Sequence, residues 1–568
     1  MKKRNGIVVA IVSVLGMLLS GCSSQATGTE LGVVELSYYD ETGEEGINTD
    51  LFYRNDLLTT GADPGVIYIT EGAYEGYFFL YNSDQLSSRG IMCMKSKDLD
   101  TWEFVSNCFV PEDASWGTEN IWAPEVSYDE ENGKYYMFYS ATNANTEAGY
   151  VNCKYLGMAV SDTPDGPFVQ YTGTNGNGTE IGIGDPIFDI ELLGYDHPLY
   201  KRGTSFIDAS PFVDPVTGDK YLYMCRNRNV HDTNIICVVK MKDWATPDYS
   251  TYTELTTVNR TTYHGKTATE RTEGEINEAP QMLYHEGVYY LTMSINATTE
   301  KEYSVIQAIG DSPMGPFEKI QESKGGLVLG TDLDWDHVSC TGSHCFVYAG
   351  EELFIVYHQN KDREMGGDMK RGIAMDRVEW AINEDGQTLL KAIGPTNSIQ
   401  PKPASYTGYS NLAKKADVTA TNVAEGSDAS YLNDGLVRLQ QVDCIEQFYG
   451  KKTVKITLDF DEYVTARALL IYNSYDYENA FYQIEKIDFS FRETVDGEAS
   501  TGIARVEDIY YDFESNAMIN YGLMRPGAPL ILEFDELEID KVTITLTCPD
   551  GQDVLGISEI MLLGKEAE

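Results

Sequence analysis

The sequence has few basic residues for its length. Lysine and arginine number 42 against 89 aspartate and glutamate residues, which gives a formal net charge of −47. A surface this acidic repels the phosphate backbone of nucleic acids, so we expect no nucleic-acid partner. The charge fits an exported protein with a neutral ligand, but it says nothing about the fold.

Several local signatures of common protein classes are also missing. The 568 residues contain no CxxC pair, no glycine-rich phosphate loop and no nucleophile elbow, which argues against zinc, nucleotide and serine-hydrolase sites. No amphipathic helix of convincing length is present either. What is abundant is tyrosine (39), phenylalanine (20) and glycine (51), residues that favour strands and turns. The sequence therefore predicts an all-β protein, and its length predicts two or more domains.

The N-terminus carries a basic start and a short apolar run. The apolar stretch from Ile7 to Leu19 is too short to span a membrane, and no stop-transfer pattern follows it. The "LSGC" that ends it resembles a bacterial lipobox, with Cys22 as the residue that would be lipidated. We therefore expect residues 1–22 to be a lipoprotein signal peptide, 23–47 a tether, and the exported protein to be anchored to the envelope membrane through Cys22.

A pattern of strands and turns recurs five times between residues 48 and 400. Each unit has a short polar turn, an apolar strand, a glycine-containing turn and an aromatic strand. Examples are "GADPGVIYITEGAYEGYFFLYNS" and "FIDASPFVDPVTGDKYLYMCRN". Taken as equivalent, Asp63, Ala123, Asp208, Glu278 and His344 recur every 60 to 85 residues. This spacing predicts a five-bladed β-propeller over 48–400.

Propeller geometry gives the acidic positions of this repeat a meaning. Equivalent residues of the innermost strands point at one axis, and three of the five positions hold the carboxylates Asp63, Asp208 and Glu278. A single aspartate before proline is common in turns. Three converging carboxylates are costly unless function maintains them. We therefore predict a site at the axis that is built on these three residues.

The residues that carry this site resemble glycoside hydrolase family 43, whose five-bladed enzymes remove arabinofuranose or xylose units with inversion. The resemblance covers the whole propeller. It implies that Asp63 in "DP" is the general base, and that Asp208 in "IDASPF" orients the acid and adjusts its pKa. It also implies that Glu278 in "NEAP" is the general acid, where the family commonly has "EGP". Inverting hydrolysis needs this division between a base that activates water and an acid that protonates the leaving oxygen.

The same resemblance indicates three substrate-binding residues. "WAP" matches Trp122, Ala123 and Pro124, which makes Trp122 a candidate wall for a sugar ring. His344 in "TGSHCF" either ligates a central calcium or a water, or is a hydrogen-bonded buried histidine. Arg371 in "KRGIAMDRVEW" matches a late arginine that touches substrate. The resemblance also implies that catalysis requires no cofactor.

The sequence changes character after residue 395. "GPTNSIQPKPASYTGYSN" is rich in proline, serine and asparagine, and we interpret residues 401–407 as a linker. Residues 408–568 alternate apolar and polar positions, which predicts a jelly-roll β-sandwich. This part resembles discoidin-type domains, in which a structural Ca²⁺ would bridge Asp434 and Glu559, unless these are only a turn and a strand-end residue. The loop "NSYDYENAFYQ" is the candidate sugar-binding loop, and a purely structural role stays open.

Several functions fit these observations. The first hypothesis is an exo-acting α-L-arabinofuranosidase or β-D-xylosidase, because the long connection at 170–205 would wall a pocket. An endo-arabinanase or galactanase of the same family is the alternative, as is a non-catalytic, glycan-binding surface lipoprotein. Retaining fructosidases are less consistent, since their "NDPNG", "RDP" and "EC" motifs are not found. We expect a monomer that acts on polysaccharides or oligosaccharides.

Overall fold

The structure is a computed structural model that describes residues 29–39, 48–55, 59–83, 90–143, 153–188, 203–259, 273–330, 338–360, 371–440, 443–495, 498–511 and 528–566. The chain forms two compact units, which we describe separately. The propeller unit comprises Asn55–Pro395 with Val442–Cys444, and the sandwich unit comprises Met1–Arg54, Thr396–Gln441 and Ile445–Glu568. The predicted signal peptide and Cys22 lie outside the described residues. In the described ranges, no helix combines the length and the apolar character that crossing a membrane requires.

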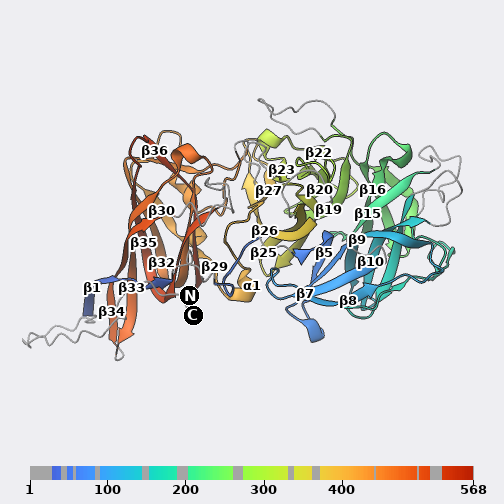
Figure 1. Ribbon diagram of the computed structural model, residues 1–568, viewed down its shortest axis with the longest axis horizontal. Coiled ribbons are helices and arrows are strands. Elements are labelled where there is room, and N and C mark those ends of the chain that lie inside the picture. The colour runs from blue at the N-terminus through green and yellow to red at the C-terminus, as the bar shows by residue number, and fades with distance from the viewer. Residues whose placement is uncertain are drawn as a thin grey trace, which may run out of the picture. The chain divides into compact units, whose positions relative to one another are not determined.

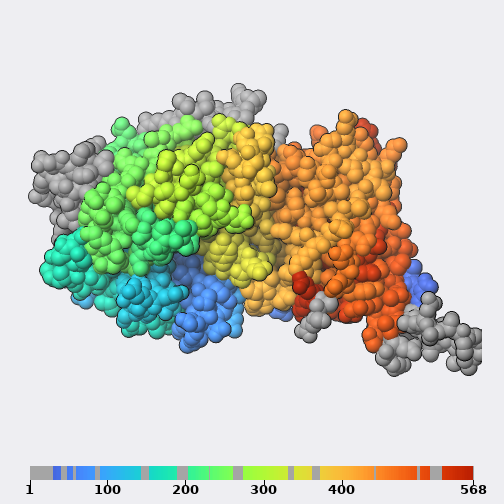
Figure 2. Space-filling model, turned by 180° about the vertical axis from the view of Figure 1, so that it is seen from behind, coloured from blue at the N-terminus to red at the C-terminus, as the bar shows by residue number. Residues whose placement is uncertain are grey.

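Five antiparallel sheets form the propeller unit (Figure 1), which confirms the predicted five blades. In the space-filling view the colours run around this unit from blue to yellow, since each blade is one stretch of chain (Figure 2). The strands are, blade by blade, β5 (Ala62–Tyr68), β6 (Phe78–Ser83), β7 (Ile91–Ser96) and β8 (Glu103–Phe109); β9 (Gly117–Asp129), β10 (Lys134–Asn143), β11 (Lys154–Ser161) and β12 (Val169–Gln170); β15 (Ser205–Val213), β16 (Lys220–Asn227), β17 (Ile235–Asp243) and β18 (Thr246–Glu254); β19 (Asn277–His285), β20 (Val288–Ile295), β21 (Ser304–Gly310) and β22 (Glu318–Lys319); and β24 (Gly342–Ala349), β25 (Glu352–Asn360), β26 (Arg371–Ile382) and β27 (Thr388–Ala392).

The blades hold together because both faces of each sheet are covered by a neighbouring blade. All six residues of β6 are buried, and its first four, Phe78–Tyr81, form a continuous apolar and aromatic run rather than an alternating one. Four core clusters each combine residues of two successive blades, such as Tyr81 with Tyr139 and Phe206 with Phe138. The short strand β4 (Thr59–Thr60) pairs with β26, so the beginning of the propeller segment joins its last blade.

Every innermost strand is interrupted at the same place. Its pairing with the second strand shifts register there, which is the signature of a β-bulge. One residue at each bulge has a positive φ between 46° and 56°, a conformation that costs a side-chain-bearing residue about 1–2 kcal/mol. These bulge residues are Asp63, Ala123, Asp208, Ala279 and Ser343.

The bulges correct the predicted equivalence of two blades. The repeat aligned Glu278 and His344 with Asp63, but the bulge residues of blades four and five are Ala279 and Ser343. Glu278 therefore stands one position before its bulge, the place that Trp122 takes in blade two. His344 stands one position after its bulge. Sequence spacing could not resolve this single-residue offset, because it depends on backbone conformation and not on residue type.

The sandwich unit is built on one ten-stranded sheet with a buried apolar core. The pairing of its longest strands, β32 and β35, shifts register, and so does the pairing of β32 with β36. Such shifts bend strands, so one sheet can fold over to form both layers of the predicted β-sandwich. The strands are β1 (Thr29–Glu35), β2 (Tyr38–Tyr39), β29 (Ser410–Asn411), β30 (Asp417–Ala420), β31 (Phe448–Lys451), β32 (Thr453–Asn473), β33 (Gln483–Val495), β34 (Glu498–Tyr510), β35 (Pro529–Thr547) and β36 (Val554–Glu566). The discoidin-type identity of this unit stays a prediction.

Two predicted connecting segments contain regular structure. The predicted tether at 23–47 includes β1, which pairs in parallel with β34, and β2, which pairs with β35. Leu31, Val34 and Leu36 pack against the sandwich core, which explains why this stretch joins the sheet. The predicted linker at 401–407 includes the end of β28 (Gln400–Pro401), which pairs with β3 (Phe52–Tyr53), and the single turn α1 (Ala404–Thr407). Proline and serine suit a short edge strand and a helix start as well as a linker.

The predicted calcium ligands of the sandwich unit differ in exposure. Glu559 lies on β36 and is fully buried, whereas Asp434 is exposed and its carboxylate accepts a hydrogen bond from Leu436 N at 2.8 Å. Within the described part of the chain, no group of three His, Cys, Asp or Glu side chains could hold a metal ion. The bond to Leu436 is that of a turn aspartate, and the calcium stays a prediction.

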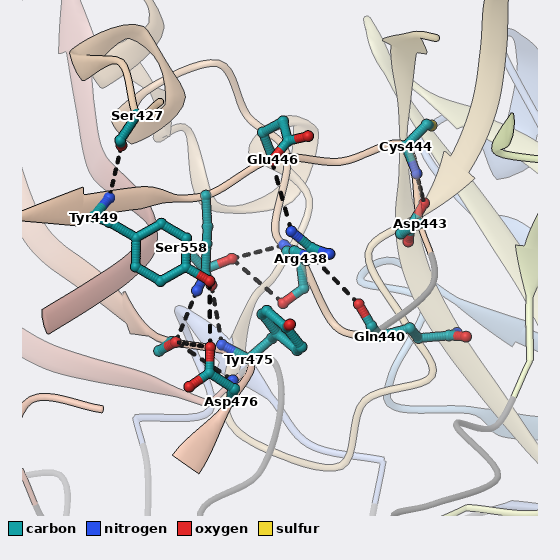
Figure 3. Close-up of polar contacts among 12 residues, drawn as sticks. Ser427, Arg438, Gln440, Asp443, Cys444, Glu446, Tyr449, Tyr475, Asp476 and Ser558 are labelled. Atoms are coloured by element: carbon teal, nitrogen blue, oxygen red, sulfur yellow. Dashed lines mark hydrogen bonds and ion pairs between the residues drawn. The ribbon is translucent and has the colours of Figure 1, made fainter. Parts of the chain in front are cut away.

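The predicted sugar-binding loop is held by many hydrogen bonds (Figure 3). Asp476 accepts from Asn479 N at 2.9 Å and from the Tyr449 hydroxyl at 3.3 Å. The guanidinium of Arg438 lies 4.4 Å from the centre of the Tyr475 ring and covers one of its faces. The loop is therefore fixed in shape, with Tyr475 offering at most one face to a ligand.

Candidate active site

The three predicted carboxylates meet at the propeller axis. Asp63, Asp208 and Glu278 lie on the innermost strands β5, β15 and β19 of three different blades. Asp63 and Asp208 line one small axial chamber. The N–H of Ala279, the neighbour of Glu278, donates to Asp208 Oδ2 at 3.0 Å. The convergence predicted from the repeat is therefore present in the structure.

Asp63 is surrounded by hydrogen-bond donors and positive charge. Its Oδ2 accepts from the Ser83 hydroxyl at 2.8 Å, and its Oδ1 lies 3.2 Å from Arg371 Nη1 and 3.5 Å from His358 Nδ1. Burial would raise the pKa of Asp63, but the guanidinium of Arg371 and the hydrogen bond from the Ser83 hydroxyl hold it well below its usual range. This carboxylate stays ionised at any physiological pH and can accept a proton from water.

The pKa of Glu278 is shifted in the opposite direction, upward. Its Oε1 accepts from the Tyr303 hydroxyl at 3.0 Å, and its Oε2 accepts from Asn234 Nδ2 at 3.2 Å. Burial raises the pKa of Glu278 to about 7, in spite of the lowering effect of these two hydrogen bonds. A carboxyl with this pKa is substantially protonated at neutral pH and can donate a proton.

Asp208 forms a coupled pair with Glu278. Burial and the nearby charges of Glu278 and Asp63 raise the pKa of Asp208, while the N–H of Ala279 favours its ionised form. The two carboxyls compete for protons, so they titrate as a pair and not as independent groups.

A ring of residues on the second strands supports the bulges. In each blade the second strand places one residue opposite the residue that precedes the bulge. In four blades this residue accepts the N–H of the bulge residue in the following blade. The four bonds run from Ala123 to Ser83 Oγ at 2.9 Å, from Asp208 to Ser140 Oγ at 3.0 Å, from Ser343 to Ser294 Oγ at 2.9 Å, and from Asp63 to His358 Nδ1 at 3.4 Å.

Blade three lacks the hydrogen bond that the other four blades make from the second strand to the next bulge. Cys225 takes the equivalent position and lies 3.5 Å from the carbonyl oxygen of Asn277. The N–H of the next bulge residue, Ala279, is then bound by the carboxylate of Asp208. Sulfur is a weak acceptor, so a cysteine here leaves Ala279 N–H to Asp208. Sequence reasoning missed the ring, although "YNS", "FYS", "YMC", "TMS" and "VYH" mark it at corresponding places in the five units.

The predicted substrate-binding residues lie in different environments. Trp122 is 39% exposed, and the ammonium of Lys154 lies 4.1 Å from its ring centre. The exposed ring can still take a sugar on its free face. Arg371 bonds directly to Asp63, so it supports the base in addition to any contact with substrate.

His344 lies in the axial chamber beneath the carboxylates. It is 2% exposed, its Nε2 lies 2.8 Å from Thr292 Oγ1, and burial lowers its pKa to about 3. These contacts are those of a neutral, hydrogen-bonded buried histidine. The chamber that it lines with Glu125 and Gln281 has a volume of about 20 Å³, enough for one water molecule. Calcium takes six to eight oxygen ligands, waters included, and a calcium ion at this place stays a prediction.

An ionised carboxylate and a protonated one on opposite blades of a propeller provide the two groups that a glycoside hydrolase needs. The family model of glycosyl hydrolases family 43 matches residues 53–387, which is more than half of the chain. The protein belongs to this family.

The chain is also similar to named relatives and to proteins of known structure. The chain is 24% identical over 321 residues to a beta-D-galactofuranosidase of Aspergillus niger, covering 54% of this chain and 76% of the relative. It is 23% identical over 297 residues to a beta-xylosidase of Xylanibacter ruminicola, covering 48% of this chain and 76% of the relative. A thermostable family-43 glycoside hydrolase of known structure has a TM-score of 0.48 and 28% identity, over 62% of this chain and 99% of that one.

Proposed function

We propose that this glycoside hydrolase inverts the anomeric configuration, with Asp63 as general base, Glu278 as general acid and Asp208 as the residue that orients Glu278 and adjusts its pKa. The observation that carries the proposal is the opposite tuning of two carboxyls in one site. The pKa of Asp63 is held low by Arg371, and the pKa of Glu278 is raised to about 7 by burial. Pairs of titratable groups that are tuned apart in this way mark acid and base roles.

The proposed reaction is a single displacement. Asp63 takes a proton from a water molecule as the water oxygen bonds to the anomeric carbon. The bond from that carbon to the leaving oxygen breaks on the opposite face, and Glu278 gives its proton to the leaving oxygen. The cycle ends with Asp63 protonated and Glu278 ionised, and solvent restores both. Arg371 and Ser83 fix the orientation of Asp63, so its free lone pair meets the water in one geometry.

The proposed substrates are non-reducing terminal α-L-arabinofuranose or β-D-xylose units. Support comes from the names of the relatives, among them a beta-xylosidase and a xylosidase/arabinosidase of Humicola insolens. The exposed ring of Trp122, one position before the blade-two bulge, is a suitable wall for such a sugar.

The connection at 170–205 gives less support to exo action than its length predicted. Its described hairpin, β13 (Gly173–Thr174) with β14 (Glu180–Ile181), is tied to blade three by the bond from Gly176 N to Thr246 Oγ1 at 2.8 Å. Ser205 and Thr246 lie at the two different ends of the blade-three sheet. Asp208 is near the Ser205 end, so Thr246 is far from it. The hairpin therefore does not wall the site, and residues 189–202 lie outside the described residues.

A panel of nitrophenyl glycosides tests the proposed activity. We expect the highest kcat/KM on the α-L-arabinofuranoside, the next highest on the β-D-xyloside, and little turnover of the β-D-galactofuranoside. Linear arabinan and xylan, assayed beside the panel, report internal cleavage through the size of the first products. Turnover of the polymer into mid-sized fragments, with no activity on any nitrophenyl glycoside, would contradict exo action.

A further inference from the structure

Tyr303 connects the two halves of the site. It directly precedes β21, is 1% exposed, and donates its hydroxyl to Glu278 Oε1 at 3.0 Å. Its ring lies parallel to the imidazole of His358, with centroids 5.7 Å apart and planes 6° apart. His358 Nδ1 in turn lies 3.5 Å from Asp63 Oδ1. One aromatic ring thus contacts both the predicted acid and the histidine beside the predicted base.

The position of this ring is fixed from two sides. The hydroxyl of Thr341 donates to the backbone oxygen of Tyr303 at 3.3 Å. A Cβ on Gly342 would lie 2.5 Å from Tyr303 Cε1, so the ring fits only because residue 342 is glycine. Burial raises the pKa of Tyr303 well above its usual value, so its hydroxyl keeps its proton and acts as a donor.

We propose that Tyr303 is a positioning residue that selects which oxygen of Glu278 delivers the proton. This rests on the proposed function of Glu278 as general acid. In a carboxylic acid the carbonyl oxygen is the better hydrogen-bond acceptor, and the donor on Oε1 is a hydroxyl. The bond to Oε2, from Asn234 Nδ2, is longer at 3.2 Å. Tyr303 therefore marks Oε1 as the carbonyl oxygen and leaves Oε2 as the oxygen that carries the proton to the substrate.

Other groups around Glu278 set the background for its titration. The carboxylate of Asp63 opposes the ionisation of Glu278, while Arg371 favours it. The charge of Glu278 in turn raises the pKa of Asp208. His358 is neutral, because burial lowers its pKa to about 4. Burial also raises the pKa of the Cys225 thiol, so that group is uncharged. None of these groups is removed by a change at Tyr303, which makes the tyrosine hydroxyl testable in isolation.

The substitution Tyr303→Phe tests this role. It removes the donor to Glu278 and keeps the ring, so the ionised acid loses a stabilising bond and its pKa rises. We expect the basic limb of the pH–kcat profile to move to higher pH by about one unit, the size of one hydrogen bond to a charged group. We expect kcat to fall about tenfold with little change in KM. This is a part of the rate enhancement that general acid catalysis contributes, because Glu278 itself is still present.

Tyr290→Phe is the matched control. Tyr290 is also 1% exposed, and its hydroxyl bonds to the carbonyl oxygen of Thr388 at 2.9 Å, away from the carboxylates. Its substitution should leave the pH profile unchanged. Gly342→Ala is a second variant, which keeps the Tyr303 hydroxyl but displaces the ring, and it should move the basic limb in the same direction as Tyr303→Phe.

Infrared difference titration separates this proposal from the proposed function. The Glu278 carboxyl band is assigned with Glu278→Gln and titrated in the wild type and in Tyr303→Phe, without substrate. A titration of Glu278 that shifts to higher pH in Tyr303→Phe supports the positioning role. A titration that is unchanged or shifts to lower pH overturns it, whatever the activity. If the wild-type protein hydrolyses no glycoside, the proposed function is wrong. The titration then still shows whether the Tyr303 hydroxyl stabilises the ionised Glu278.

Discussion

Glu278→Ala should remove most activity on oligosaccharides and polysaccharides but spare a larger share on nitrophenyl glycosides. A sugar leaving group must be protonated as it departs, and general acid catalysis contributes about 10²–10⁴-fold to such a step. A nitrophenolate leaves with little protonation, so it needs the acid less. We expect a loss within that range on the natural linkage and a distinctly smaller loss on the nitrophenyl glycoside, measured as kcat/KM on both substrates.

The neighbouring Glu275 supplies a control for this prediction. It lies three residues before Glu278, its side chain is 50% exposed, and it pairs with Arg228 on the surface. Glu275→Ala should leave both activities close to wild type, because exposed ion pairs contribute little. Equal losses of Glu278→Ala on the two substrates would show that Glu278 does not protonate the leaving group.

Asp63→Ala should be nearly inactive on both kinds of substrate. Every substrate needs the attacking water to be deprotonated, so a better leaving group offers no rescue, and a loss of about 10²–10⁴-fold is expected on each. The change also leaves the guanidinium of Arg371 without the carboxylate that it bonds at 3.2 Å. Thermal unfolding of the variant, measured in parallel, separates a lost base from a lost fold.

The activity of Asp63→Ala also shows whether the roles of general acid and general base are assigned to the correct residues. If Asp63→Ala is the variant rescued by a good leaving group, then Asp63 is the acid and Glu278 the base. Asp219→Ala is the control, since Asp219 is 39% exposed and pairs with Lys240 on the surface of blade three. It should retain wild-type activity on both substrates.

The five blades and the three carboxylates could be predicted because they depend on residue type. Aromatic strands and glycine turns repeat along the chain, and an acid at corresponding turns marks one axis. The single-residue offset in blades four and five could not be predicted. It follows from the positive φ of Ala279 and Ser343, and neither alanine nor serine signals such a conformation.

The hydrogen-bond partners of the carboxylates could not be predicted from the sequence either, because they lie far from them along the chain. Tyr303 and Asn234 contact Glu278 across 25 and 44 residues of sequence, and His358 reaches Asp63 across 295 residues. The first contact forms within blade four and the second between blades three and four, whereas the third requires the last blade to close on the first. Residues 29–35, which lie in the predicted tether, add a strand to the edge of the sandwich sheet.

Proton NMR of the first-formed sugar tests the central claim most directly. The wild-type protein is mixed with a nitrophenyl glycoside that it hydrolyses, and the anomeric signals are followed before mutarotation mixes the two forms. We expect the first product to have the anomeric configuration opposite to that of the substrate, since Asp63 activates water for a single displacement. A first product with retained configuration would mean that a carboxylate attacks the sugar itself, and the assignment of Asp63 as general base would be wrong.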